Sequence, residues 1–340
     1  DVYQKKLEPT KDIIAFFCFV GFFPQLFAGP IDRATNLLPQ FYIKRKFEYE
    51  KAVDGMRQIL WGFVKKIVIA DNCAASVNQI FANYETLPAS TLVLGAVFFS
   101  FQIYTDFSGY SDIAIGTSRL FGVSSMKNFS VPYFSRDIAE FWRRWHISLT
   151  SWFRDYLYIP LGGNRGKKYQ VIRNTFIIFL VCGIWHGANW TFIFWGFINA
   201  VFFLPLLLSG KNRKNTDTVA QGKMLPSVRE LIQMGTTFVL ATLAWIFFRA
   251  DSIGQAFSYI GHFFSKSLIA VPKGSGAELI LPLLLIMVLV VEWLQRDKQH
   301  GLDFSNRNIP SFARITIYYV LIAIIMIFGA SQQTFIYSQF

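Results

Sequence analysis

Six apolar runs constrain this chain more than any other feature. They lie at about 12–29, 87–105, 174–208, 232–250, 278–294 and 315–330. A transmembrane helix needs about 20 largely apolar residues, and 174–208 is long enough for a hairpin of two helices. Charged residues make up only 16% of the 340 residues, against roughly 25% in a soluble domain. The sequence therefore predicts an all-α, polytopic integral membrane protein.

The same composition excludes other classes of protein. A chain with 53% hydrophobic residues would aggregate as a soluble domain and buries too much surface to stay disordered. Cys18, Cys73 and Cys182 are too few and too far apart for a disulfide scaffold. The net charge is +12, but no nucleic-acid-binding motif accompanies it, so we expect no nucleic acid partner. We expect the lipid bilayer as a partner, and the basic excess is typical of cytoplasmic loops that meet anionic headgroups or an anionic substrate.

The basic residues also predict an orientation. Loops 162–173, 209–231 and 295–314 hold four, five and four Lys or Arg residues, whereas loop 251–277 holds two. The positive-inside rule then places the first three loops in the cytoplasm. Segment 57–82 is apolar in places but carries Lys65, Lys66 and Asp71 in its middle. It either lines a polar interior or lies at the membrane interface.

A polar stretch follows the run 87–105. Asp106 and Asp112 flank Gly109, and glycine permits a tight bend. Asp112 is then interpreted either as a cap at the start of another helix or as part of a buried polar cavity.

Residues 137–158 have the pattern of one amphipathic helix. Its apolar stripe steps by three and four residues through Trp142, Trp145, Leu149, Trp152 and Tyr156. His146 borders that stripe, either as an ordinary packed histidine or as part of a site. Pro160 ends the helix. Gly162, Gly163 and Asn164 follow, either as a plain turn or as a backbone nest for an anion, and Arg165 can add a forked contact to a phosphate.

His186 is the sharpest candidate for chemistry, because it interrupts the apolar stretch 174–208 near its middle. An ionisable residue within a membrane is costly unless it is paired or faces water, and an imidazole suits general-base catalysis near neutral pH. Cys182 lies four residues earlier, but two ligands do not make a zinc site. The sequence contains no HExxH, CxxC, GxSxG, Walker or GxGxxG motif. We therefore expect no metal and no bound cofactor.

Five segments together resemble the membrane-bound O-acyltransferase (MBOAT) family, and within it the bacterial alginate O-acetyltransferase subgroup. They read FPQLFAGPIDR at 23–33, NFSVPY at 128–133, RDIAEFWRRWHISL at 136–149, WFRDYLYIPLGGNR at 152–165 and GIWHG at 183–187. The resemblance implies one membrane domain over residues 1–340, with a ring of transmembrane helices around a central funnel or tunnel. Members usually carry further helices before the first motif, so we expect N-terminal helices to be missing from this sequence.

The resemblance also implies the site residues. The hallmark histidine of the family falls on His186 and its second histidine on His146, which are the expected catalytic residues. Around them we expect a substrate-binding set of Trp142, Arg143, Arg144, Trp145, Trp152, Asp155, Asn164, Arg165, Trp185 and Asn189.

The implied activity is transfer of an acetyl group from cytoplasmic acetyl-CoA, or an acyl carrier, across a bacterial inner membrane to an exported polysaccharide such as alginate. A periplasmic SGNH-type acetyltransferase is the expected partner. Two alternatives remain: transfer of D-alanyl or another acyl group to a cell-wall polymer, and a non-enzymatic polymer conduit.

Overall fold

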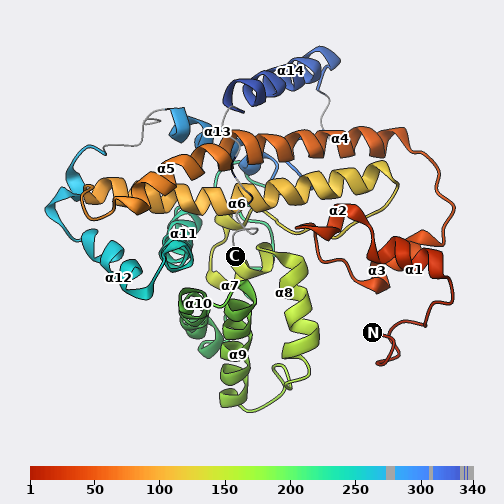
Figure 1. Ribbon diagram of the computed structural model, residues 1–340, viewed down its shortest axis with the longest axis horizontal. Coiled ribbons are helices and arrows are strands. Elements are labelled where there is room, and N and C mark those ends of the chain that lie inside the picture. The colour runs from red at the N-terminus through yellow and green to blue at the C-terminus, as the bar shows by residue number, and fades with distance from the viewer. Residues whose placement is uncertain (273–279, 306–308, 330–332, 334, 336–340) are drawn as a thin grey trace.

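The computed structural model describes residues 1–340 except 273–279, 306–308, 330–332, 334 and 336–340 (Figure 1). The described part is built from helices and contains no strand. Its α-helices are α1 Ile13–Val20, α2 Phe23–Leu26, α3 Ala34–Leu37, α4 Tyr49–Phe63, α5 Asp71–Ala82, α6 Ala89–Leu120, α7 Ile138–Arg144, α8 Ile147–Phe153, α9 Lys168–His186, α10 Trp190–Leu208, α11 Val228–Arg249, α12 Ile253–His262, α13 Ile280–Leu294 and α14 Ser311–Phe328. Two π-helical segments, Val64–Ala70 and Arg154–Tyr158, continue α4 and α8.

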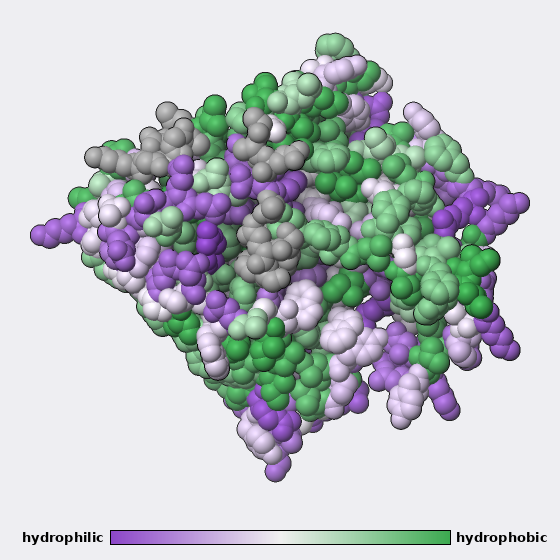
Figure 2. All heavy atoms as spheres, in the orientation of Figure 1, coloured by the Kyte–Doolittle hydropathy of each residue, from purple (hydrophilic) through white to green (hydrophobic). Residues whose placement is uncertain are grey.

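Four described helices, α6, α10, α11 and α14, are long and apolar enough to cross a membrane, and α13 is a shorter apolar helix. The run 174–208 forms the expected hairpin from α9 and α10, which projects from the rest of the molecule (Figure 1). Apolar side chains cover the middle of this arm, and polar ones gather at its tip (Figure 2).

The expected span over 12–29 is wrong. Helix α1 has only eight residues and ends at Val20, before Gly21, and α2 begins at Phe23 with Pro24 in its first turn. Proline has no N–H to continue a preceding helix, and the chain then folds back so tightly that a Cβ on Gly29 would lie 2.3 Å from the Pro24 carbonyl oxygen. The segment is therefore a short irregular structure beside the helices.

Helix α6 extends well beyond the apolar run 87–105. It is a single helix of 32 residues that includes Asp106, Gly109 and Asp112, so the bend at Gly109 and the cap at Asp112 are both wrong. The alternative interpretation of Asp112, as part of a buried polar cavity, is confirmed, because its carboxylate is buried and lines a cavity of about 40 Å³ together with Lys65 and Ser111. Asp112 and Asp106 are each paired with a lysine from the opposite helix.

That opposite helix runs from α4 through the π-helical segment into α5 and lies along α6 (Figure 1). Two glycine pairs bring the backbones together. A Cβ on Gly62 would lie 2.6 Å from the Gly109 carbonyl oxygen, and one on Gly116 would lie 2.5 Å from that of Gly55. Because each helix contributes glycines seven residues apart, the contact repeats every two turns along the same faces.

The close approach places buried charges opposite each other. The Lys65 ammonium lies 2.7 Å from Asp112, and the Lys66 ammonium lies 2.8 Å from both Asp106 and Asp71. Gln58 donates a second hydrogen bond to Asp112. Segment 57–82 thus lines a polar interior, which was one of its two expected placements.

Replacing Gly109 with alanine should destabilise the protein by about 1–3 kcal/mol, the usual cost of overpacking. The added Cβ would meet the Gly62 carbonyl oxygen at 2.8 Å, and a backbone atom cannot move aside as a side chain can. Gly235→Ala on α11 is the matched control, since a Cβ there meets nothing within 4 Å. Thermal unfolding of both variants in detergent measures the difference, and equal midpoints would contradict the packing argument.

Candidate functional site

The expected single helix over 137–158 is broken in the structure. Helix α7 ends at Arg144, Trp145 is extended, and His146 has a left-handed backbone with φ +42° and ψ +55° before α8 begins. The break is held from outside, because Ser130 N–H donates to the Arg144 carbonyl and Ile147 N–H donates to the Asn128 carbonyl. The segment 128–130 therefore pairs with the break and supplies partners that a continuous helix would not need.

The break buries His146 and orients its ring. The residue is 4% exposed, and its Nδ1 lies 3.1 Å from Oδ1 of Asn128. Phe107 of α6 stands edge-on to the imidazole at 4.6 Å between ring centroids, and the Phe129 ring is stacked on it at 6.4 Å. A histidine with this environment has one nitrogen committed to the protein and one available to a ligand.

His186 is the last residue of α9. Gly187 follows with φ +152°, where a side chain would also meet the Phe192 ring. The Asn189 side chain then caps α10 by accepting a hydrogen bond from the Thr191 N–H. The His186 ring stands edge-on to Trp195 and Phe248 at 5.2 and 5.1 Å. The turn between α9 and α10 thus places the buried imidazole of His186 among aromatic rings.

Both histidines line the same cavity of about 380 Å³. Its remaining walls come from Phe107, Trp185 and the irregular segment after α1, namely Gln25, Leu26, Phe27, Ala28, Gly29 and Ile31. Both histidines also line a second, smaller and apolar cavity of about 70 Å³. Its other lining residues include Trp142, Trp145, Leu149 and Cys182. Two imidazoles at one cavity can hold and move a proton at a bound hydroxyl.

A third cavity, of about 650 Å³, begins at the residue after His186. Gly187, Ala188 and Asn189 line it on one side, and its other lining residues include the hydrogen-bonding side chains of Asn78, Gln102 and Arg249 beside aromatic ones such as Phe192 and Phe248. It lies at the His186 end of α9, and the loop at the Lys168 end is one helix length away, about 28 Å for 19 residues. The histidine pair therefore lies close to a polar cavity at one end of the arm.

Comparison with known proteins identifies the fold. A profile described as "MBOAT, membrane-bound O-acyltransferase family" matches residues 5–240. The chain belongs to the membrane-bound O-acyltransferase family. It is therefore a membrane-bound, multi-pass protein.

Three relatives indicate the range of activities in this family. The chain is 41% identical over 265 residues to "Probable alginate O-acetylase AlgI" of Pseudomonas aeruginosa, covering 78% of this chain and 48% of that protein. It is 40% identical to the peptidoglycan O-acetyltransferase of Helicobacter pylori, covering 70% and 44%. It is 33% identical to the teichoic acid D-alanyltransferase of Bacillus subtilis, covering 54% and 49%. The chain thus spans about half the length of the relatives it matches.

The structure brings several of the expected site residues of this family member together. Trp142 and Trp145 line the smaller cavity beside both histidines, Trp185 lines the larger one, and Asn189 lines the third. Trp145 also packs against Trp245 at 4.9 Å, so it belongs to the core as much as to the cavity.

Other expected substrate-binding residues lie elsewhere. Trp152 is 39% exposed and packs on Phe153 and Tyr156. Asp155 pairs with Arg154 at 2.7 Å and Arg33 at 3.1 Å, and these partners, Arg154 first, hold its pKa below the ordinary value against the opposing effect of burial. Asn164 and Arg165 are exposed at the tip of the arm. Their side chains do not share a cavity with the histidines.

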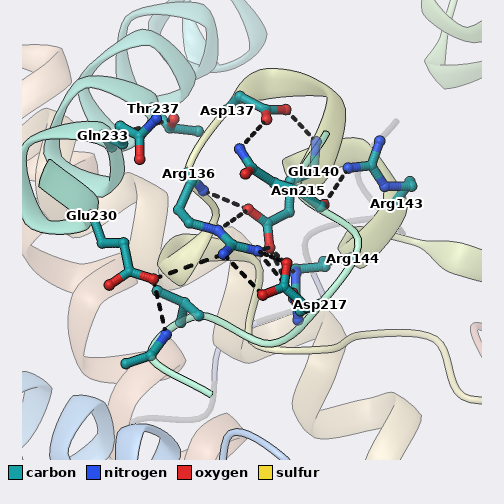
Figure 3. A network of polar contacts seen from close by, with 12 residues as sticks. Arg136, Asp137, Glu140, Arg143, Arg144, Asn215, Asp217, Glu230, Gln233 and Thr237 are labelled. Carbon is teal, nitrogen blue, oxygen red and sulfur yellow. Dashed lines mark hydrogen bonds and ion pairs between the residues drawn. The ribbon is translucent and has the colours of Figure 1, made fainter. Parts of the chain in front are cut away.

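Arg143 and Arg144 are engaged in a network that fixes the loop between α10 and α11 (Figure 3). Arg143 donates to the carbonyl oxygens of Asn212 and Asn215, and Arg144 donates to that of Asp217. The buried carboxylate of Glu140 lies at the centre and takes hydrogen bonds from Arg136 and Arg144. Through these hydrogen bonds both arginines hold the loop between α10 and α11 in place.

The network also binds an acidic group of that loop. Arg136 donates to Asp217 at 3.0 Å, and this hydrogen bond lowers the pKa of Asp217 more than burial raises it. Arg136 also lies 3.7 Å from Glu230 at the start of α11 (Figure 3). One guanidinium thus joins α7, the loop and α11.

Sequence reasoning assigned no role to three parts of the site. These are Phe107, the segment 25–29, and Asn128, which bonds to His146. The motifs at 23–33 and 128–133 were the available signal, but their contacts with the histidines are long-range and leave no periodicity in the sequence.

Replacing Glu140 with alanine should release the loop between α10 and α11. The change removes the carboxylate shared by two arginines, one of them only 7% exposed, and breaking a buried pair in this way costs about 3–5 kcal/mol. Trypsin should then cleave several-fold faster at the exposed Lys211, Arg213 and Lys214.

Glu48→Ala is the matched control, because its ion pair with Lys51 is on the surface, where such pairs contribute about 0–1 kcal/mol. Limited proteolysis followed by mass spectrometry reads the cleavage sites. An unchanged cleavage rate in Glu140→Ala would show that the arginine network does not hold the loop.

Proposed function

We propose that this chain is the histidine-bearing core of an O-acetyltransferase that modifies an exported polysaccharide, such as alginate, from a bacterial inner membrane. The observation that carries the proposal is the shared cavity of His146 and His186, which come from elements 40 residues apart. The names of the relatives support acetyl transfer to a polysaccharide, since the acetylating ones are 40–41% identical over 70–78% of the chain. The D-alanylating relative is 33% identical over 54%.

The proposed reaction begins with a hydroxyl acceptor at the cavity. His186 takes the hydroxyl proton while the oxygen attacks the thioester carbonyl, which forms a tetrahedral oxyanion. When that intermediate collapses, the carbon–sulfur bond breaks and the protonated imidazole returns its proton to the leaving thiolate. The products are an acetyl ester and a free thiol, and the histidine regains its starting state.

The two ends of α9 suit the two substrates. The tip at 162–168 carries the exposed Arg165, Lys167 and Lys168, which fit the phosphates of acetyl-CoA or the acidic surface of an acyl carrier. By the positive-inside rule this tip lies in the cytoplasm. The polar cavity of about 650 Å³ at the other end then faces outward, toward the polymer or a periplasmic SGNH-type partner. In the assembled enzyme, a ring of helices would surround a funnel joining the two sides.

His186→Ala should abolish acetyl transfer, a loss of at least about 100-fold, because it removes the general base. The experiment supplies labelled acetyl-CoA to the cytoplasmic face of membrane vesicles holding the chain, with its companion proteins, and follows label on the outer side. His262→Ala is the matched control, since His262 lies on α12, away from both histidine cavities, and its Nδ1 hydrogen-bonds to the Ser258 carbonyl of its own helix.

Label that crosses equally in wild type and His186→Ala would overturn the catalytic assignment. Supplying labelled D-alanine on its carrier in parallel separates acetyl from D-alanyl transfer. A protein that moves polymer but never turns over either donor would be a conduit.

A further inference from the structure

Asn128 occupies a position that the proposed reaction does not explain. It is fully buried, it comes from the 128–133 motif, and its side chain touches three others: His146, Ser148 and Ser111 of α6. Its backbone carbonyl also accepts the Ile147 N–H. One asparagine thus holds both the backbone and the ring of His146.

We propose that Asn128 is a positioning residue that keeps the proton of neutral His146 on Nδ1 and leaves Nε2 as a hydrogen-bond acceptor toward the cavity shared with His186. The inference rests on the proposed function only for the claim that this acceptor takes part in acetyl transfer. The tautomer itself follows from the contacts.

The contacts of Ser148 and Ser111 decide which end of the amide faces His146. The atom 3.1 Å from His146 Nδ1 also lies 3.4 Å from the Ser148 backbone N–H, which can only donate, and 2.9 Å from the Ser148 hydroxyl. It is therefore the carbonyl oxygen Oδ1. The amide nitrogen Nδ2 donates to Ser111 at 3.0 Å. Since an oxygen faces Nδ1, Nδ1 must carry the hydrogen.

The surroundings leave little freedom for another arrangement. Phe107 and Phe129 pack against the imidazole, and the left-handed backbone of His146 is fixed by the pairing of segment 128–130 with the helix break. Ser111 is anchored on α6, next to Asp112 in its buried ion pair with Lys65. A ring flip would place the Cδ2–H group against Oδ1, and the other tautomer would place a bare acceptor nitrogen there.

This arrangement gives His146 a definite chemical role. A neutral imidazole with hydrogen on Nδ1 cannot donate from Nε2 to an oxyanion, but it can accept a proton there while Asn128 continues to accept from Nδ1. We therefore assign His146 to accepting a hydrogen bond at the cavity from His186 when His186 carries the hydroxyl proton. Among the described residues, the titratable side chains that line the two histidine cavities with it are His186 and Cys182.

The first test reads the tautomer without any activity. The chain has four histidines, so labelling with ¹³C,¹⁵N-histidine in lipid nanodiscs gives four ring systems, and His146→Gln identifies the signals of His146. Solid-state NMR at neutral pH should show His146 with a protonated Nδ1 and a bare Nε2. A protonated Nε2 with a bare Nδ1 would overturn the inference, whether or not the chain transfers acetyl groups.

The second test compares a variant that removes the side-chain oxygen facing His146 Nδ1 with one that keeps it. Asn128→Ala should give a mixture of both tautomers and lower kcat roughly ten- to a hundredfold at nearly constant KM, because a misplaced base loses part of its contribution. Asn128→Asp keeps an oxygen at Nδ1, so it should retain the tautomer. Its added negative charge should move the acidic limb of the pH–rate profile to higher pH.

Asn199→Ala is the matched control, since Asn199 is also buried, at 2% exposed, and within the described part of the chain its side chain donates to the Trp195 carbonyl of its own helix. It should leave the His146 tautomer and the pH profile unchanged. If Asn128→Ala keeps a single Nδ1-protonated form, Asn128 does not position the ring. If the tautomer changes as expected while acetyl transfer persists in both Asn128→Ala and His146→Ala, the inference about position stands, and the catalytic role of His146 in the proposed function is wrong.

Discussion

Backbone contact between α4 and α6 is the constraint on which the rest of the structure depends. Gly62 and Gly109 let the two helices approach until carbonyl oxygens fill the space of absent side chains. Only at that separation does Lys65 reach Asp112 and satisfy a charge that would otherwise be costly in an apolar interior. Ser111, beside Asp112, is thereby placed to hold Asn128, and Asn128 holds His146. The position of one site histidine is thus fixed through a chain of contacts that begins at a helix–helix interface.

Much of the helical framework could be predicted from hydropathy, because spans leave a signal in their own residues. The hairpin 174–208 and the apolar helices at α11, α13 and α14 are examples. The run 12–29 shows the limit of that signal: its composition suits a span, but Gly21 and Pro24 break it into short pieces. Helix α6 shows the opposite error, since its polar half reads as a new element until Lys65 and Lys66 are known to neutralise it.

The histidines were identifiable from the sequence, but their environments were not. A three-and-four spacing over 137–158 predicts one helix, yet hydrogen bonds to residues 128–130 stabilise a break at His146 that no local pattern encodes. The same limit applies to Arg143 and Arg144. Both belong to the substrate-binding set expected from the resemblance, whereas in the structure Glu140 and a loop some 70 residues away bind their guanidinium groups. Hydrophobic periodicity predicts which face of a helix a residue occupies. The residue's role there depends on contacts with residues distant in sequence.

The places where the helices break explain why a site exists at all. Within a bilayer, irregular backbone is tolerated only where it is buried in protein or lines a cavity, because its polar groups have no lipid partner. Three irregular segments in the described part of the chain are of this kind: the one after α2 at Gly29, the one between α7 and α8 at His146, and the one between α9 and α10 at Gly187. Residues at or next to all three line the same cavity of about 380 Å³. Packing alone does not explain why three irregular segments meet at one cavity, since continuous helices would pack at a lower cost in free energy. The three irregular segments are, however, what a membrane protein needs in order to present two imidazoles to a polar substrate.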